Sequence, residues 1–272
     1  MFIRKNTARS LVSVTALAAI GALLLGCVSV GDVANAMGKQ NQPAPDKSAS
    51  QQQPQAQQQQ PQQQPSGATF AYKMQFGAFY GAMWSFGWFG YKDANYKPGQ
   101  GTVWQITSSR GSKEPTMFER AFLKVNADKS QWWRLKFQGG NKKDEIVYEF
   151  LVGADTQVQK VRFKDPDSGQ VQEFVPDQSS AQQGYTPAQP TRDQLAKSLV
   201  GTESVTVRAG TFTADHYRYI DPKSSYTGDS WITKTVPGLM VKFMGTNQKK
   251  EATASGELVQ IENGVTTLLG SF

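Results

Sequence analysis

The amino-acid sequence predicts a mainly β fold, with one large antiparallel curved sheet or half-barrel and one or two helices packed on it. The first observation is a series of short runs, rich in β-branched and aromatic residues, between positions 118 and 175. Turn-forming stretches separate these runs at positions 126–128, 139–141, 153–155 and 165–169. The second observation is a similar block from position 203 onward. Helical patterns are few, and we expect them to lie on this sheet.

In the first block, the runs alternate between apolar and charged residues. Trp133, Leu135 and Phe137 share one side of an extended strand, whereas Arg134 and Lys136 share the other. The run at positions 158–164 alternates in the same way. The pattern predicts a meander of hairpins with one buried face and one solvated face.

The second block predicts further strands at positions 205–207, 212–220, 230–235, 239–244 and 256–261. Ala209 and Gly210 provide a turn after the first of these strands. Asn263 and Gly264 lie between apolar runs, and this dipeptide is a strong hairpin signal. We therefore expect the chain to end in a paired strand within the sheet.

Between the two blocks, a polar loop at positions 177–190 precedes one short helix. Thr191 and Gln194 form a capping box at its start. Leu195 and Leu199 share a helix face, and Gly201 follows as a stop signal. The helix has a single apolar stripe, so we expect that stripe to lie on the sheet.

Residues 70–91 contain ten aromatic side chains and glycines at positions 77, 81, 87 and 90. As a helix, this segment has an apolar stripe on one face and small residues on another. As a strand, it is apolar at all even positions from 70 to 88. A strand of that length is unusual without a bend, so a helix that ends near Trp84 is the preferred interpretation.

Two roles are open for this aromatic segment. It can form part of the core, as aromatic stripes at helical spacing usually do. It can also line or close an apolar cavity, or contact a membrane, because large exposed apolar patches mark binding surfaces. The candidate ligand or lid residues are Phe76, Tyr80, Met83, Trp84 and Trp88.

The only cysteine, Cys27, directly follows a leader with positive charges at positions 4, 5 and 9 and an uncharged apolar stretch at positions 11–25. Leu24, Gly26 and Cys27 match a lipoprotein cleavage pattern, whereas Leu25 is bulkier than the residue usually preferred there. The segment resembles a bacterial lipoprotein signal peptide, cleaved between Gly26 and Cys27. The alternatives are an uncleaved membrane helix, for which the run is short, and a secreted protein with an unusual free thiol.

The resemblance implies that Cys27 carries a diacylglyceryl thioether and an acylated amine, with fatty acyl chains such as palmitate. Two or more chains give stable attachment, so the membrane is an expected partner. Val28, Ser29 and Val30 follow the cysteine, whereas bacterial lipoproteins with Asp at that point tend to stay on the inner membrane. We therefore expect an outer-membrane location, on either the periplasmic or the surface side.

The chain divides into three parts: a signal peptide at residues 1–26, a lipid anchor and disordered tether at residues 27–67, and a single β-rich domain at residues 68–272. The tether is rich in Gln and Pro and lacks the apolar residues that folding requires. Its roughly thirty disordered residues reach about 30 Å as a coil and about 90 Å when extended. The folded domain can therefore stand away from the bilayer.

The net charge of +7 falls to +4 without the leader, which holds three positive residues and no negative residue. The remaining basic residues are scattered along the sequence rather than clustered. Nucleic-acid-binding domains gather such residues on one face. We therefore expect no nucleic-acid partner.

The nearest sequence signature in the domain is a hairpin-plus-turn phrase, AGTFTA at positions 209–214 and WITKTVPGLMVK at positions 231–242. Together with the anchor and the many strands, the domain resembles the half-barrel lipoprotein carriers of the LolA and LolB type. The resemblance implies a sheet curved around an apolar pocket that holds an acyl chain or a lipoprotein. The glutamine-rich tether and the dense aromatic start depart from these carriers.

The sequence offers little for catalysis. The single histidine, His216, has no cysteine or histidine partner with metal-ligand or triad spacing, and we expect it to be structural. The acidic pairs at positions 144–145 and 165–167 fall at predicted hairpin ends, where Asp favours turns. We therefore expect no enzyme activity, no cofactor and no metal.

Two functions remain. In the first, an outer-membrane-anchored lipoprotein binds a lipid, a lipoprotein or another apolar ligand through its β domain. In the second, a structural or surface lipoprotein has no ligand cavity. It binds a protein partner through the sheet edge or the region of Trp132 and Trp133.

Overall fold

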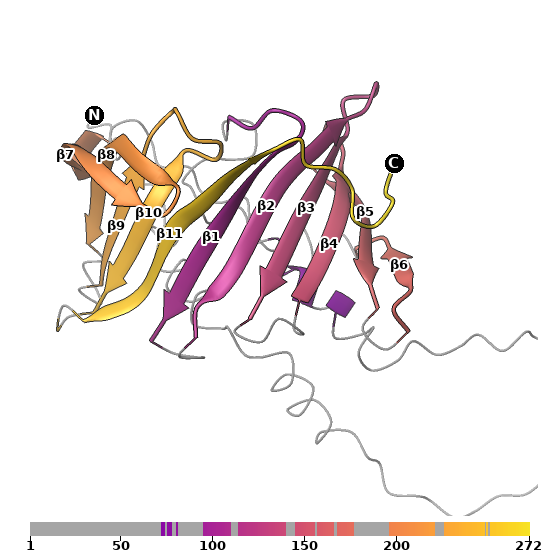
Figure 1. Cartoon of the computed structure of the whole chain (residues 1–272), viewed down its shortest axis with the longest axis horizontal. Helices are drawn as coiled ribbons and strands as arrows, with labels where there is room; N and C mark the ends of the chain where they lie inside the picture. Colours follow the sequence, from indigo (N-terminus) through magenta and orange to yellow (C-terminus); the bar gives the residue numbers. More distant parts are fainter. Residues whose placement is uncertain are drawn as a thin grey trace, which may run out of the picture.

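The computed structural model describes residues 72–73, 75–77, 80, 95–109, 114–139, 145–155, 157–165, 168–176, 196–220, 226–247, 249 and 251–272. These residues form an 11-stranded antiparallel sheet, which confirms the predicted fold class (Figure 1). The strands are β1 (Gln100–Ser108), β2 (Thr116–Val125), β3 (Gln131–Gln138), β4 (Glu145–Val152), β5 (Val158–Lys164), β6 (Val171–Phe174), β7 (Leu199–Val207), β8 (Gly210–Ile220), β9 (Thr227–Ile232), β10 (Met240–Thr246) and β11 (Ala252–Asn263).

The strand order places the first and last strands together in the middle of the sheet. From β1 the chain runs outward through successive hairpins to β6 at one edge. It resumes at the opposite edge with β7 and returns inward to β11, which pairs with β1. The sheet therefore depends on one long-range pairing, between Gln100 at the start of β1 and Asn263 at the end of β11.

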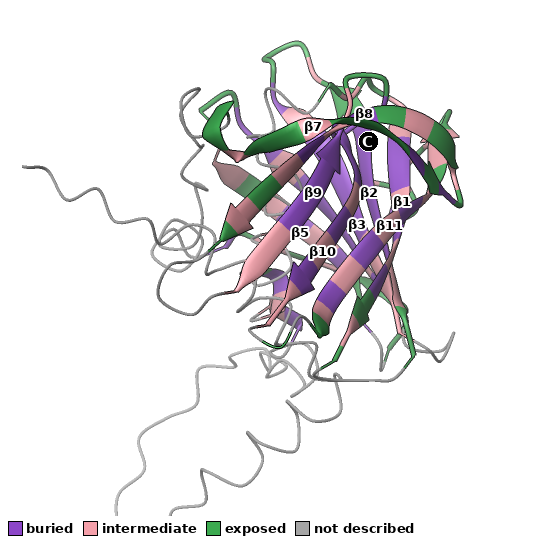
Figure 2. Ribbon diagram, turned by 90° about the vertical axis from the view of Figure 1, so that its left-hand side faces the viewer, coloured by how far each residue is buried: buried purple, intermediate pink, exposed green. Residues whose placement is uncertain are grey.

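The two faces of the sheet differ in chemistry. Residues opposite each other in neighbouring strands share a face, so Phe118 lies beside Phe137, and Leu135 beside Tyr148. We call this aromatic face the inner face. The opposite face, which carries Arg134, is the outer face. Figure 2 shows the curvature of the sheet and, in purple, the buried residues of its central strands.

The β7 end of the sheet folds back on itself. The amide of Ala209, in the turn between β7 and β8, donates to the carbonyl of Leu258 in β11 at 3.1 Å. Arg208 pairs with Glu257 of β11 at 3.2 Å. β7 also lies close to β10. The β7–β8 hairpin therefore closes over the end of the sheet.

The aromatic segment at the start of the domain is helical at each residue that the structure describes. Tyr72, Lys73, Phe76 and Tyr80 all have helical backbone. The helix interpretation is confirmed for these positions. Residues 1–71 and 81–94 lie outside the described residues, so the signal peptide, the tether and candidate residues Met83, Trp84 and Trp88 do too.

The predicted helix at positions 191–201 is wrong at its second half. Within its described part, only residues 196–198 are helical. Leu199 begins β7 and pairs with Tyr217 of β8, and Gly201 lies inside the same strand. Pairing with β8 satisfies the backbone here, whereas so short a helix would have had little apolar surface to bury.

The predicted terminal hairpin is also wrong. β11 ends at Asn263, and Gly264 adopts a φ of +71°. Residues 264–272, which we call the C-terminal segment, contain no strand and cross the outer face over β2, β3 and β4 (Figure 1). β11 already pairs with β1 and β10. It therefore has no free edge for a returning strand.

Candidate binding surfaces

The inner face of β4 and β5 is lined by aromatic rings. Tyr148, Phe150 and Phe163 have no exposed surface. The rings of Tyr148 and Phe163 lie 6.3 Å apart, and Phe174 of β6 packs edge-on against Phe163 at 6.0 Å. Burial raises the pKa of the Tyr148 hydroxyl well above its ordinary value. This surface suits an apolar group and offers little to a charged one.

The N-terminal helix covers these rings. Phe76 is only 1% exposed, and its ring lies 5.4 Å from Tyr148, 5.6 Å from Phe150 and 6.0 Å from Phe174. The hydroxyl of Tyr148 donates to the backbone carbonyl of Tyr72 at 2.8 Å. Aromatic pairs in these geometries add about 0.5–1.5 kcal/mol each beyond their buried area. The helix is therefore packed firmly onto the inner face.

Two of the five candidate ligand or lid residues are placed by the structure. Phe76 lies within the aromatic cluster, and Tyr80 is half-buried with its ring 5.6 Å from Phe150. Both therefore lie between the helix and the sheet, a position that serves a core residue and a lid residue equally well.

Trp132 and Trp133 do not form an exposed surface. Trp133 is 1% exposed on the inner face, where its ring stacks on Phe122 at 4.5 Å. Trp132 is 5% exposed on the outer face, with Phe272 of the C-terminal segment 6.2 Å away. Trp133 is therefore unavailable to a protein partner, and Trp132 is covered by the chain's own C-terminal segment.

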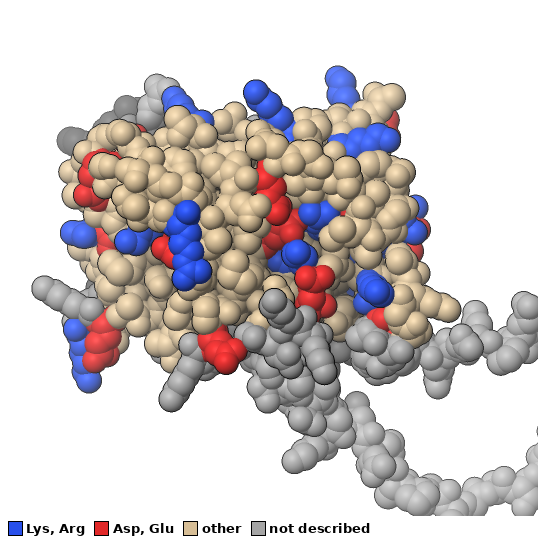
Figure 3. Space-filling view, viewed as in Figure 1, with Lys and Arg blue, Asp and Glu red and all other residues tan. Residues whose placement is uncertain are grey.

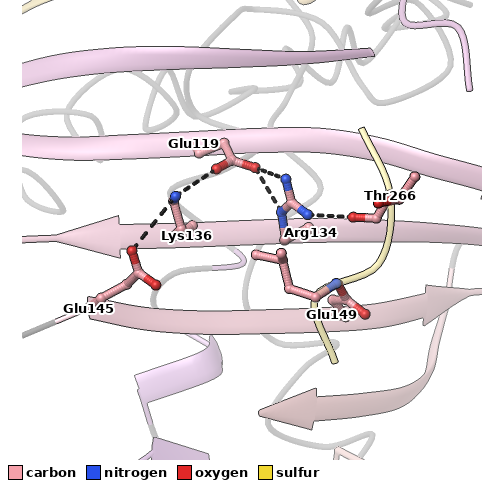
Figure 4. A network of polar contacts seen from close by, with 7 residues as sticks. Glu119, Arg134, Lys136, Glu145, Glu149 and Thr266 are labelled. Carbon is pink, nitrogen blue, oxygen red and sulfur yellow. Dashed lines mark hydrogen bonds and ion pairs between the residues drawn. The ribbon is translucent and has the colours of Figure 1, made fainter. Parts of the chain in front are cut away.

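The outer face carries a buried network of charges, drawn in Figure 4. The Nε and Nη2 atoms of Arg134 donate to one oxygen of Glu119 at 2.7 and 2.5 Å. Lys136 lies 3.3 Å from the other oxygen of Glu119 and 3.6 Å from Glu145. Arg134 is 5% exposed, so the expectation of a solvated face is wrong at this position. The C-terminal segment is what covers it.

The C-terminal segment is held by side chains of this network. Arg134 Nη1 donates to the carbonyl of Thr266 at 2.6 Å. One oxygen of Glu149 accepts from the amide of Leu268 at 2.5 Å. The other accepts from the hydroxyls of Thr267 at 2.6 Å and Ser271 at 2.5 Å. Glu149 has no exposed surface, so three hydrogen bonds from one segment replace its hydration.

Glu262 of β11 lies near the same network. One of its carboxylate oxygens is buried and has no hydrogen-bond partner in the part of the chain that the structure describes. Burial raises the pKa of this carboxyl above its ordinary value, and the charge of Glu119 raises it further. Arg134 and Lys136 act in the opposite direction.

His216 belongs to a second polar cluster near the β7 edge. Its Nε2 lies 2.6 Å from Asp229 and its Nδ1 lies 3.3 Å from Glu203. Its ring stacks on Trp231 at 4.5 Å, and Arg218 donates to the same oxygen of Asp229 at 2.8 Å. Within the described ranges, no group of three or more His, Cys, Asp or Glu side chains could hold a metal ion. The geometry ties β7, β8 and β9 together.

Basic and acidic side chains are interspersed on the face of the molecule in Figure 3. Neither the basic nor the acidic side chains form a continuous stripe on this face. None of the helices in the described part of the chain has the length and apolarity that crossing a membrane requires.

No protein-family model matches the chain, and no curated protein matches it. Solved structures with a similar fold include MucB, in the MucA/MucB complex of Pseudomonas aeruginosa, at 17% identity and a TM-score of 0.40. That match covers 64% of this chain and 55% of MucB, so the chain spans little more than half of that protein.

Two further structures of similar fold come from other bacteria. A putative exported protein of Bacteroides fragilis with a YmcC-like fold is 15% identical, covers 62% of this chain and 97% of its own, and has a TM-score of 0.33. A putative lipoprotein of Parabacteroides distasonis is 13% identical, covers 61% and 96%, and has a TM-score of 0.30.

Proposed function

We propose that this chain is a non-enzymatic lipoprotein of the cell envelope, anchored in the outer membrane through lipid on Cys27. Its β domain binds an acyl chain, a lipoprotein or another apolar ligand on the inner face. The observation that carries the proposal is the aromatic inner face of β4 to β6, covered by a helix that follows directly on the tether.

The contacts between helix and sheet suit exchange with an apolar ligand. Phe76 packs its ring against Tyr148, Phe150 and Phe174, and the gain from burying apolar surface there does not depend on which apolar group supplies it. An acyl chain offers apolar surface of the same kind, so it can replace these ring contacts. The bond from Tyr148 to the Tyr72 carbonyl needs a substitute, and a ligand carbonyl supplies one.

The anchor is tested by replacing Cys27. A Cys27→Ala protein has no thiol to acylate, so we expect it not to incorporate labelled palmitate in cells. The unchanged chain is the control and should incorporate the label. Equal labelling of the Cys27→Ala protein would contradict lipid anchoring at this residue.

The ligand site is tested by fluorescence quenching with a brominated fatty acid. Trp104 and Trp133 lie on the inner face, whereas Trp132 lies on the outer face. A bound chain should quench Trp104 and Trp133, as well as the candidate ligand residues Trp84 and Trp88, so replacing these four by Phe should remove most of the quenching. Quenching that survives the fourfold substitution, or no quenching of a folded protein, would argue against the inner-face site. A bromine-free fatty acid of the same length is the control.

A second candidate, in which the domain binds a protein partner and has no ligand cavity, has one observation in its favour. β7 is a nine-residue edge strand, and its first two residues, Leu199 and Val200, are 46% and 55% exposed. A partner can add a strand to such an edge. Val200→Lys should then abolish partner capture and leave fatty-acid quenching unchanged. The opposite pattern would exclude this edge as the interface.

A further inference from the structure

The C-terminal segment contacts the sheet as a bound peptide does. Its carbonyl and amide groups pair with side chains of β3 and β4, at Thr266 and Leu268, rather than with strand backbone. Arg162 of β5 donates to the carbonyl of Gly270 at 2.5 Å. The segment therefore lies across four strands without joining the sheet.

We propose that the outer face of β2 to β5 is a recognition site for an extended peptide, occupied here by the C-terminal segment, and that the same segment of a second copy can take its place. The site lies on the opposite face from the proposed apolar ligand. Its test is therefore independent of the inner-face test.

The recognising groups contact both the backbone and the side chains of the C-terminal segment. Glu149 accepts from one amide and two hydroxyls, at Leu268, Thr267 and Ser271. Hydrogen bonds to a charged acceptor are the stronger class in proteins, and three of them on one carboxylate fix the register of the segment. We therefore expect the site to select peptides that carry Thr and Ser at the positions of Thr267 and Ser271.

Phe272 adds a second recognition point. The ring of Phe272 lies 6.2 Å from Trp132 and receives the ammonium group of Lys124 at 4.8 Å. Phe272 itself is 48% exposed, and within the segment only Leu269 is buried. Most of the segment is thus on the surface, and it is reached from solvent without opening the core.

A departing segment uncovers both charged and apolar groups. Water can hydrate Arg134, Glu149 and Arg162, whereas the apolar cluster of Ala121, Leu123 and Trp132, on which Val265 packs, favours an occupied site. In the register of the sheet, Glu149 lies between these two arginines, which themselves pair with Glu119 and Glu173. Gly264, with a φ of +71°, connects the segment to β11 and provides a point where the chain can turn away.

Exchange between two copies reproduces each of these contacts. A segment that reaches from a second copy meets the same Glu149, Arg134 and Arg162, so no new complementarity is needed. Swapping of an identical element between two copies is a low-cost route to a dimer for this reason.

The proposal is tested with a fluorescein-labelled synthetic peptide of residues 264–272. The protein is the full chain with Thr267→Val and Ser271→Ala, which loosens its own segment, and a second form truncated after Asn263. We expect the peptide to bind both forms with a dissociation constant in the micromolar range, about 10⁻⁶ to 10⁻⁵ M, and the unchanged chain at least about tenfold more weakly.

Two controls make the test specific. A peptide with the same two substitutions should bind at least about tenfold more weakly than the natural peptide. Glu149→Gln in the loosened full chain should weaken the natural peptide by a similar factor. If the folded, loosened chain fails to bind the peptide, or binds it without regard to Thr267, Ser271 and Glu149, the proposal is wrong. The full-length form decides the matter even if the truncated form does not fold.

Discussion

Replacing Phe76 by Ala tests whether the N-terminal helix is an integral part of the β domain. Phe76 is 1% exposed and packs against four rings, those of Tyr80, Tyr148, Phe150 and Phe174. Truncation of a buried Phe costs about 3–5 kcal/mol, because transfer free energy is lost and a cavity remains. We expect Phe76→Ala to lower the free energy of unfolding by an amount in that range.

The assay is equilibrium unfolding in urea, followed by near-ultraviolet circular dichroism. Leu268→Ala is a matched control on an exposed apolar residue, at 56% exposure, and should change the free energy of unfolding by less than about 0.5 kcal/mol. Phe76→Ala should also increase the binding of a hydrophobic dye, since it opens the aromatic face. A loss below about 1 kcal/mol for Phe76→Ala would refute the reasoning, because the helix would then contribute little to the fold.

Three further predictions follow from single residues. Gly77 lies in the helix, and a methyl group added there would meet open space, so Gly77→Ala should raise the free energy of unfolding by about 0.5–1 kcal/mol in urea titrations. A Cβ on Gly256 would lie 2.0 Å from the Phe243 ring, so Gly256→Ala should lower the thermal midpoint, with a cost of about 1–3 kcal/mol. Burial and Glu119 raise the pKa of Glu262, so the folded state holds this proton more tightly than the unfolded state, and the resulting stabilisation is lost as pH rises through the raised pKa. Glu262→Gln should therefore stabilise the protein in urea titrations at about pH 7 and leave it unchanged at about pH 4; a uniform effect at both pH values would contradict this prediction.

The hairpins were predictable because their turns are determined by local sequence. At the turn after β5, the Asp165 side chain accepts from the amide of Ser168 at 2.8 Å, and Gly169 takes a φ of +69°. Asp and Gly are the residues that such turns require. The same holds for the alternation around Trp133 and Leu135, which are buried on the inner face as the pattern predicts.

The parts that sequence analysis missed depend on distant segments. No strand was predicted for β1, whose place in the sheet is set by pairing with β11, from Gln100 to Asn263. Arg134 alternates like a solvated residue, yet it is buried by Thr266, 132 positions away. Glu149 gave no signal as a binding residue, because its three partners lie in the C-terminal segment. The local sequence pattern of a strand does not show that a distant segment will cover one of its faces.

Native mass spectrometry, with lipid extraction, of a chain expressed without residues 1–27 tests most directly whether the inner face holds an apolar ligand. We expect a stoichiometric acyl-chain ligand on the folded protein, and a smaller bound fraction after Gly77→Ala strengthens the covering helix. A folded protein that shows only its own mass, even after incubation with fatty acids, would contradict an apolar ligand site on the inner face.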